Sequence, residues 1–213
     1  MSVKSKTATE KTNVAKLTII AMLSAVAVAL QYLEFGVPLV PFFLKMDLSD
    51  IPELIGAFII GPLGGVLICL VKNLVHLLVS QSGLVGELSN FLLGAVFALI
   101  AGCIYRRRKT KTVALLACLA ATVAMALVSL PTNYYIVYPI YAKLFGGMES
   151  ILGLYQAILP SADTLWKALL IFNVPFTLVK GLLCVLVTML IYKPLSRLFV
   201  QLSNAIGRRG TQR

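Results

Sequence analysis

Long apolar runs separated by short polar segments dominate the sequence, and this pattern predicts helices that cross a membrane. Each crossing helix needs about 20 mainly apolar residues. We expect an all-α fold, an integral membrane bundle of six transmembrane helices with both termini cytoplasmic and an ordered first extracellular loop. The expected spans are residues 17–34, 51–60, 66–79, 91–105, 112–138 and 164–192.

Residues 51–79 allow two interpretations, because the turn sequence GPLGG at 61–65 interrupts the apolar run. They form either one broken helix or a tight hairpin of two rather short spans. The hairpin places the basic cluster at 106–111 inside the cell, whereas a single helix places it outside. Since loops rich in Lys and Arg stay in the cytoplasm, the charge pattern favours the hairpin.

The segment between the first two spans combines features that neither a solvated connector nor a membrane helix would share. Residues 35–53, FGVPLVPFFLKMDLSDIPE, hold three of the nine prolines together with four charged side chains and many large apolar ones. A flap that closes over a cavity would carry both kinds of residue. We therefore expect this loop to be ordered and to cover a binding site.

Composition and charge agree with a membrane protein. The chain of 213 residues is 59% hydrophobic, with a mean hydropathy of +0.93 and a net charge of +11. Most of its 19 basic residues lie before the first span, at 106–111 or after the last span, whereas all acids except Glu10 fall in the expected outer segments. We expect basic cytoplasmic tails at 1–16 and 193–213 around a membrane domain at 17–192, and no nucleic-acid site.

Several kinds of chemistry find no support in the sequence. It contains no GxxxxGK[ST], GxSxG or HExxH motif, and no pair of acids that could relay protons is evident within an expected span. The four cysteines form no CxxC pair, and His76 has no partner at ligand spacing. We expect no enzyme activity, no catalytic residue, no metal and no cofactor. Lys72 and His76 lie on one helix face, in a role that the sequence leaves open.

Polar side chains near the outer ends of the expected helices are candidates for a ligand site. Asn90, Asn133, Asn173 and Lys180 can converge beneath the flap, where Phe42, Phe43, Leu44, Tyr134 and Phe176 can pack against a flat ring. The alternative is that the asparagines only join helices through hydrogen bonds of about 0.6 kcal/mol each.

Small residues recur every four positions in the first span, at Ala21, Ala25 and Ala29. Such a stripe allows another helix to approach closely. The partner is either a helix of the same chain or a separate membrane subunit.

Four motifs together resemble the riboflavin-specific S components of energy-coupling factor (ECF) vitamin transporters. They are KMDLSDIPELIGAFIIGPLGG at 45–65, KNLVH at 72–76, GELSNFLLG at 86–94 and NYYIVYPIY at 133–141. The resemblance runs from the first span to about residue 193 and implies a six-helix protein of the bacterial cell membrane. It implies capture of riboflavin outside the cell, with a transmembrane T component and two cytoplasmic ATPases, as in an ABC transporter, driving delivery inward.

The resemblance also assigns residues. Leu44, Lys45 and Asp47 match loop positions near the ligand, Asn133 and Lys180 match polar side chains that bind riboflavin, and Asn90 is a weaker match. Ala21 and Ala25, extended by Ala29, match a motif that contacts the T component. The alternatives are an S component for another vitamin, such as thiamine or biotin, and a stand-alone secondary carrier.

Overall fold

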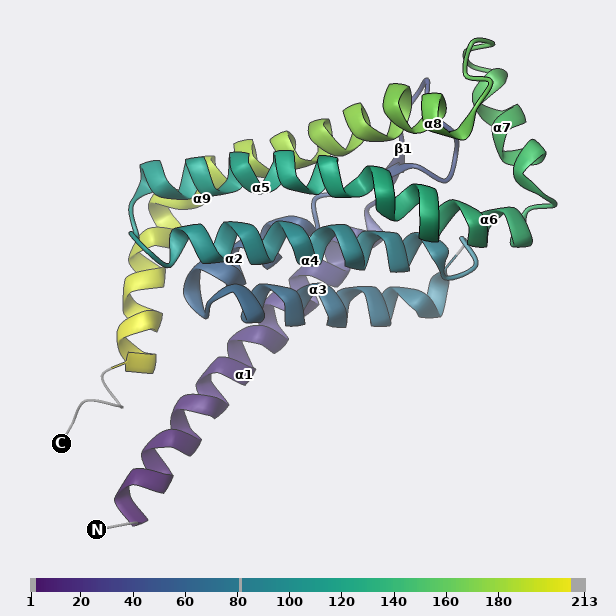
Figure 1. Cartoon of the computed structure of the whole chain (residues 1–213). Helices are drawn as coiled ribbons and strands as arrows, with labels where there is room; N and C mark the ends of the chain where they lie inside the picture. Colours follow the sequence, from purple (N-terminus) through teal and green to yellow (C-terminus); the bar gives the residue numbers. More distant parts are fainter. Residues whose placement is uncertain (1–2, 81, 208–213) are drawn as a thin grey trace.

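The chain folds into a bundle of helices that lie side by side, with one short β-ribbon (Figure 1). The computed structural model describes the backbone of residues 3–80 and 82–207, and the side chains of 13–80 and 82–192. The elements in order are α1 Val3–Tyr32, β1 Phe35–Gly36, β2 Lys45–Met46, α2 Asp50–Ile59, α3 Pro62–His76, the 3₁₀ turn η1 Leu77–Val79, α4 Val85–Tyr105, α5 Lys111–Thr132, the π turn η2 Asn133–Val137, α6 Tyr138–Leu144, α7 Met148–Gln156, α8 Leu165–Ala168, the π turn η3 Leu169–Asn173, and α9 Val174–Gly207.

Five helical stretches in the described part of the chain are long and apolar enough to cross a membrane. They are Asn13–Tyr32, Pro62–Val79, Val85–Tyr105, Lys111–Leu144 and Leu165–Tyr192. The remaining predicted span corresponds to α2, whose 10 residues are all buried among the other helices. A helix of that length extends about 15 Å and cannot cross a hydrocarbon core of about 30 Å on its own.

Residues 51–79 form two helices packed against each other rather than one broken helix, whereas the prediction that both of them cross the membrane is not tested. Gly61 separates α2 from α3 at a φ of 117°, a conformation that favours glycine, and Pro62 follows at the start of α3. The two helices pack closely because Gly65 has no side chain: a Cβ there would lie 2.7 Å from the backbone oxygen of Glu53 and 2.9 Å from the Cβ of Ala98 on α4.

The start of α1, the end of α9 and the α4–α5 connection all lie at the same end of the bundle, opposite α6 and α7 (Figure 1). The basic cluster at 106–111 therefore occupies the end where both termini emerge. This arrangement agrees with the charge argument, although it does not place either end in the cytoplasm. The predicted tails continue as helix from residue 3 into α1 and up to residue 207 in α9.

Two packed cores occupy the two ends of the bundle. The core nearer the termini joins α2, α4, α5 and α9 around Leu54, Phe97 and Cys118. The core at the opposite end joins η2, α6, α7 and η3 around Tyr138, Ile151 and Leu169. The candidate site lies between them.

Both long helical stretches that reach the core opposite the termini, called the outer core below, contain a π turn that ends two residues before a proline. η2 ends at Val137 before Pro139, and η3 ends at Asn173 before Pro175. Proline lacks an N–H group and crowds the carbonyl four residues earlier, so a wider turn relieves the helix without breaking it. Each π turn contains a buried asparagine, Asn133 or Asn173.

Candidate functional site

A cavity of about 280 Å³ opens among α3, α4, α5–α6 and α9, beneath the loop between β1 and β2. Its size lies near the lower end of the ~300–1,000 Å³ typical of small-molecule sites. All six residues that the family resemblance assigned to ligand binding line this one cavity. They are Leu44, Lys45, Asp47, Asn90, Asn133 and Lys180.

The loop at 35–50 is ordered, as predicted. β1 pairs with β2 in an antiparallel ribbon, Phe35 opposite Met46, and Lys45 Nζ lies 2.6 Å from Glu34 Oε1. Phe43 anchors the loop over the outer core, with its ring centroid 5.3 Å from that of Tyr141 and 6.1 Å from that of Tyr155. The loop therefore forms a fixed wall of the cavity.

Asp47 ends this loop and organises the entry into α2. Its Oδ1 accepts a hydrogen bond of 2.8 Å from the backbone N–H of Ser49, the Asx-turn geometry typical of aspartate before a helix. Its Oδ2 accepts a hydrogen bond of 2.9 Å from Lys180 Nζ on α9. Burial raises the pKa of Asp47, but the ammonium groups of Lys180 and Lys72 outweigh burial and hold this pKa well below its ordinary value. Asp47 is therefore an anion that ties the loop to α9.

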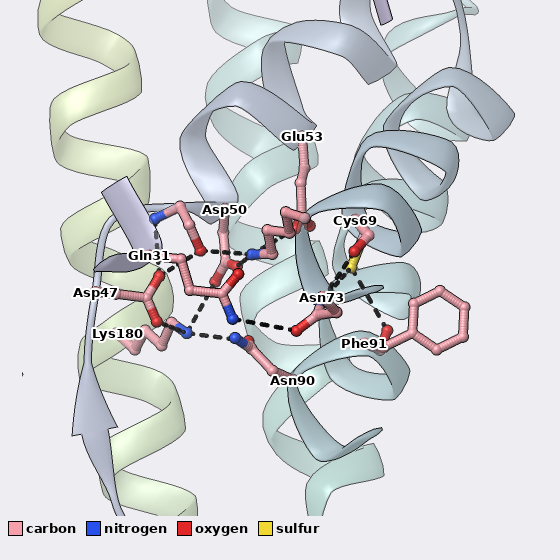
Figure 2. A network of polar contacts seen from close by, with 11 residues as sticks. Gln31, Asp47, Asp50, Glu53, Cys69, Asn73, Asn90, Phe91 and Lys180 are labelled. Carbon is pink, nitrogen blue, oxygen red and sulfur yellow. Dashed lines mark hydrogen bonds and ion pairs between the residues drawn. The ribbon is translucent and has the colours of Figure 1, made fainter. Parts of the chain in front are cut away.

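Lys180 is a shared donor at the floor of the cavity. Besides Asp47, its Nζ lies 3.5 Å from Asp50 Oδ2 and donates a hydrogen bond of 3.2 Å to Asn90 Oδ1 (Figure 2). A ligand carbonyl or hydroxyl that reached this ammonium would share it with the two carboxylates. Their negative charge also disfavours an anionic group at that point.

A second lysine lies deeper and does not line the cavity. Lys72 on α3 is fully buried, with its Nζ 2.7 Å from Asp50 Oδ1, 2.5 Å from Glu53 Oε1 and 2.6 Å from Ser49 Oγ. Figure 2 labels the two carboxylates of this group, Asp50 and Glu53. The sequence did not reveal that α2 brings both Asp50 and Glu53 to one buried ammonium group.

The two asparagines of the π turns differ in their partners. Asn173 is held by tyrosines, since its Nδ2 donates to Tyr138 Oη and its Oδ1 accepts from Tyr155 Oη, both at 2.8 Å. Burial raises the pKa of Tyr155 well above its ordinary value, so this phenol keeps the proton that it donates. Asn133 Oδ1 accepts only a long hydrogen bond of 3.4 Å from Ser89, and within the described residues its Nδ2 group has no partner.

Only some of the aromatic residues expected around the ligand line the cavity. Phe42, Phe43 and Phe176 line the cavity. Tyr134 does not line it. Its ring packs edge-on against Trp166 at 5.8 Å and against Tyr135 at 5.0 Å. The expectation for Tyr134 is therefore wrong, because the wide turn at η2 directs it toward α8.

A polar cluster at the rim of the cavity was missed in the sequence. His76 Nδ1 lies 2.9 Å from Glu87 Oε1, and Ser80 and Ser82 each donate to Glu87 Oε2 at 2.9 Å. The available signal was a single histidine and a single acid flanking a short serine-rich turn, which many sequences share.

The alanine stripe of α1 faces away from the rest of the chain. Ala21, Ala25 and Ala29 are all exposed. The interpretation as packing within the chain therefore does not apply to these three residues. Within the described residues, no group of three or more His, Cys, Asp or Glu side chains is arranged to hold a metal ion.

Comparison with known proteins identifies the architecture around this cavity. The family model for the ECF transporter, substrate-specific component, matches residues 15–192. The riboflavin transporter RibU of Staphylococcus aureus is 33% identical over 181 residues, which cover 85% of this chain and 90% of that protein. The riboflavin transporter FmnP of Bacillus subtilis is 30% identical over 182 residues, covering 84% and 90%.

A solved structure, the S component of a bacterial ECF transporter, superimposes with a TM-score of 0.68 at 32% identity, covering 86% of this chain and 96% of that one. These relatives are transporters, in agreement with the expectation that the chain is neither an enzyme nor dependent on a cofactor. The chain belongs to the substrate-specific components of ECF transporters.

Proposed function

We propose that this chain captures riboflavin from outside a bacterial cell and delivers it inward. It would do so in the cell membrane as the S component of an ECF-type ABC transporter, together with a transmembrane T component and two cytoplasmic ATPases. The observation that carries the proposal is the 33% identity, over 85% of the chain, to a protein named as a riboflavin transporter.

The chemistry of the cavity supports this ligand. Aromatic and aliphatic side chains of the loop, Phe42, Phe43 and Leu44, offer apolar surface for a flat ring. Asn133 offers an amide N–H₂ without an internal partner, and Asn90 and Lys180 offer further polar atoms for ring carbonyls or hydroxyls. Lys45 and Asp47 complete the loop side of the site. The arrangement suits an uncharged ligand with an aromatic part and a hydroxylated part.

Six membrane crossings with both termini in the cytoplasm remain part of the proposal. α2 would be the second crossing, packed within the bundle and completed across the bilayer by the loop before it. The exposed stripe Ala21, Ala25 and Ala29 on α1 would receive a helix of the T component.

The absorption spectrum of the purified protein tests the ligand. We expect a bound flavin, seen as yellow colour and fluorescence, and release of that flavin on denaturation. A colourless protein that shows no flavin affinity on titration would contradict the proposal. Displacement of flavin by thiamine or biotin in competition binding would assign the site to another vitamin.

Co-purification tests the assembly. Ala25→Leu should abolish recovery of the chain with a co-expressed T component and ATPases, because a large side chain blocks close helix approach. Flavin binding by the isolated chain should be unchanged, since Ala25 faces away from the cavity. Uptake by this chain in cells without the ATPases would instead support a stand-alone carrier.

A further inference from the structure

The buried cluster below the cavity carries unequal numbers of acids and bases. Asp47, Asp50 and Glu53 form ion pairs with Lys72 and Lys180. All five residues are at least nine-tenths buried. The neutral groups Ser49 and Asn90 accept hydrogen bonds from these lysines, and Gln31 and Asn73 bind each other in the same network (Figure 2). If every ionisable group were charged, the cluster would hold one unbalanced negative charge away from water.

The three carboxylates are not equally supported. Asp47 accepts hydrogen bonds from the N–H and the hydroxyl of Ser49 and from Lys180. Asp50 lies between both ammonium groups, with one oxygen 2.7 Å from Lys72 and the other 3.5 Å from Lys180. Glu53 has Lys72 as its single cationic contact, through Oε1 at 2.5 Å. Glu53 is therefore the carboxylate with the least stabilisation of its charged form.

The second oxygen of Glu53 is the unsupported atom. Glu53 is 0% exposed, and among the described residues neither of its oxygens accepts a hydrogen bond of good geometry. Oε1 still has the ion pair with Lys72, whereas no ion pair reaches Oε2. It points at Gly94 on α4, where a Cβ would lie 2.9 Å from Oε2 and 2.7 Å from the thiol of Cys69. A neutral carboxylic acid, unlike a carboxylate, loses little when one oxygen faces such surroundings.

The charged and titratable groups around Glu53 are few on every helix packed against it. α2 itself contributes Asp50, and α3 contributes Lys72 and Cys69. α9 contributes Lys180, with Cys184 in the neighbouring core, whereas α1 and α4 contribute neutral groups such as Gln31 and Asn90. The acid of α4, Glu87, is paired with His76 at the rim of the cavity. Transfer of a proton from Lys72 to Glu53 would leave the cluster with the same net charge. Only an added proton or an added cation balances it, and the described residues form no metal-binding group.

We propose that Glu53 is a proton-binding site, which holds one proton on Oε2 and makes the buried cluster between α2, α3 and α9 electrically neutral. The proton comes from solvent as the chain folds and stays on Glu53 at neutral pH. This inference is independent of the vitamin that the cavity binds, because Glu53 and Lys72 do not line the cavity.

Infrared spectroscopy of the purified full-length chain at neutral pH tests the site directly. We expect a C=O stretching band of an un-ionised carboxylic acid, which shifts in D₂O. The band should shift again when the protein is produced with glutamate carrying ¹³C in its carboxyl group. Absence of the band would overturn the proposal and point to a bound cation. A band whose position does not change when glutamate is labelled would also overturn the proposal, because an aspartate would then hold the proton.

Substitution identifies the glutamate. Glu53→Gln keeps the shape of the neutral acid, so it should fold and lose the band, whereas the matched control Glu149→Gln, an exposed acid in α7, should retain it. Persistence of the band in Glu53→Gln would contradict the assignment. In thermal unfolding, Asp50→Asn should lower the Tm more than Glu53→Gln, because only Asp50 is an ionised partner of both lysines. A larger loss of Tm in Glu53→Gln than in Asp50→Asn would contradict the proposal. If a variant fails to fold, the infrared band of the wild-type protein with labelled glutamate still tests it.

Discussion

At the residue scale, the site depends on which polar side chains are already bound to the protein and which are free for a ligand. Asn173 has both ends of its amide occupied by tyrosines, whereas the N–H₂ group of Asn133 at the cavity has no partner among the residues that the structure describes. Lys180 combines both properties, since its ammonium group is ion-paired within the protein and also borders the cavity. The same residue type thus serves packing at one position and recognition at the other.

This difference gives a matched pair of variants. Asn133→Ala should weaken riboflavin binding about 5-fold, the loss of one hydrogen bond of ~1 kcal/mol, with little change in Tm. Asn173→Ala should instead lower the Tm, because it removes two buried hydrogen bonds and leaves Tyr138 and Tyr155 with only each other as hydroxyl partners. Titration of flavin fluorescence and thermal unfolding measure the two effects. An unchanged affinity in Asn133→Ala would exclude that amide from the site.

Removing the ammonium group of Lys180 should lower the free energy of unfolding. Lys180→Met leaves Asp47 without its cation and Asp50 with only Lys72, so we expect a loss of about 3–5 kcal/mol in the free energy of unfolding. The double variant with Asp47→Asn should recover part of this loss. Denaturant unfolding in detergent checks both values. Equal stability of the single and double variants would show that the pair is not coupled.

The depressed pKa of Asp47 predicts how stability depends on pH. Since its folded-state pKa lies below the unfolded value of about 3.9, the ionised group stabilises the fold fully above that pH. This contribution is lost as the pH falls from there toward the folded-state pKa. The stability difference between wild type and Asp47→Asn should therefore be constant near neutral pH and shrink below about pH 4. A difference that grows in acid would contradict the assignment.

At the scale of elements, short and interrupted helices shape the cavity. α2 is too short to cross a membrane alone, but it brings Asp50 and Glu53 under the loop. The sequence predicted the helical runs, the ordered loop and the hairpin at Gly61, because apolar periodicity and turn residues are local signals. It did not predict the π turns or the positions of Tyr134 and Glu87, since these depend on side chains supplied by distant helices.

The packing of α2, α3 and α4 predicts the effect of one methyl group. Gly65→Ala would place its Cβ within 3 Å of the Glu53 backbone oxygen and of Ala98, so the helices must separate. We expect a destabilisation of about 1–3 kcal/mol, measured by thermal or denaturant unfolding. Gly153→Ala in α7 is the control, because its Cβ would meet no atom within 4 Å. Equal effects of the two substitutions would contradict this account.

At the scale of the whole molecule, the two ends of the bundle differ in charge and in construction. The end with the termini carries the basic connection between α4 and α5, whereas the opposite end carries the loop, the rim cluster and the cavity. Charge patterning in the sequence was sufficient to assign these groups to opposite ends. It could not pair individual acids with individual lysines, because those pairings join α2, α3 and α9.

Labelling in intact cells tests the orientation. In a cysteine-free background, Leu39→Cys at the 78% exposed tip of the loop should react with a membrane-impermeant maleimide. Arg107→Cys in the α4–α5 connection should react only after the cells are permeabilised. The opposite pattern would reverse the proposed topology and place the cavity on the cytoplasmic side.

The two π turns have a further consequence for how such a cavity diversifies. Each turn accommodates one residue beyond what an α-helix would hold over the same length, so removing that residue would rotate the following segment by about 100° relative to the preceding one. A single-codon insertion or deletion here would present new side chains to the ligand while the packed half near the termini stayed in register. The length of these two turns is therefore a natural variable through which related chains can acquire different substrates.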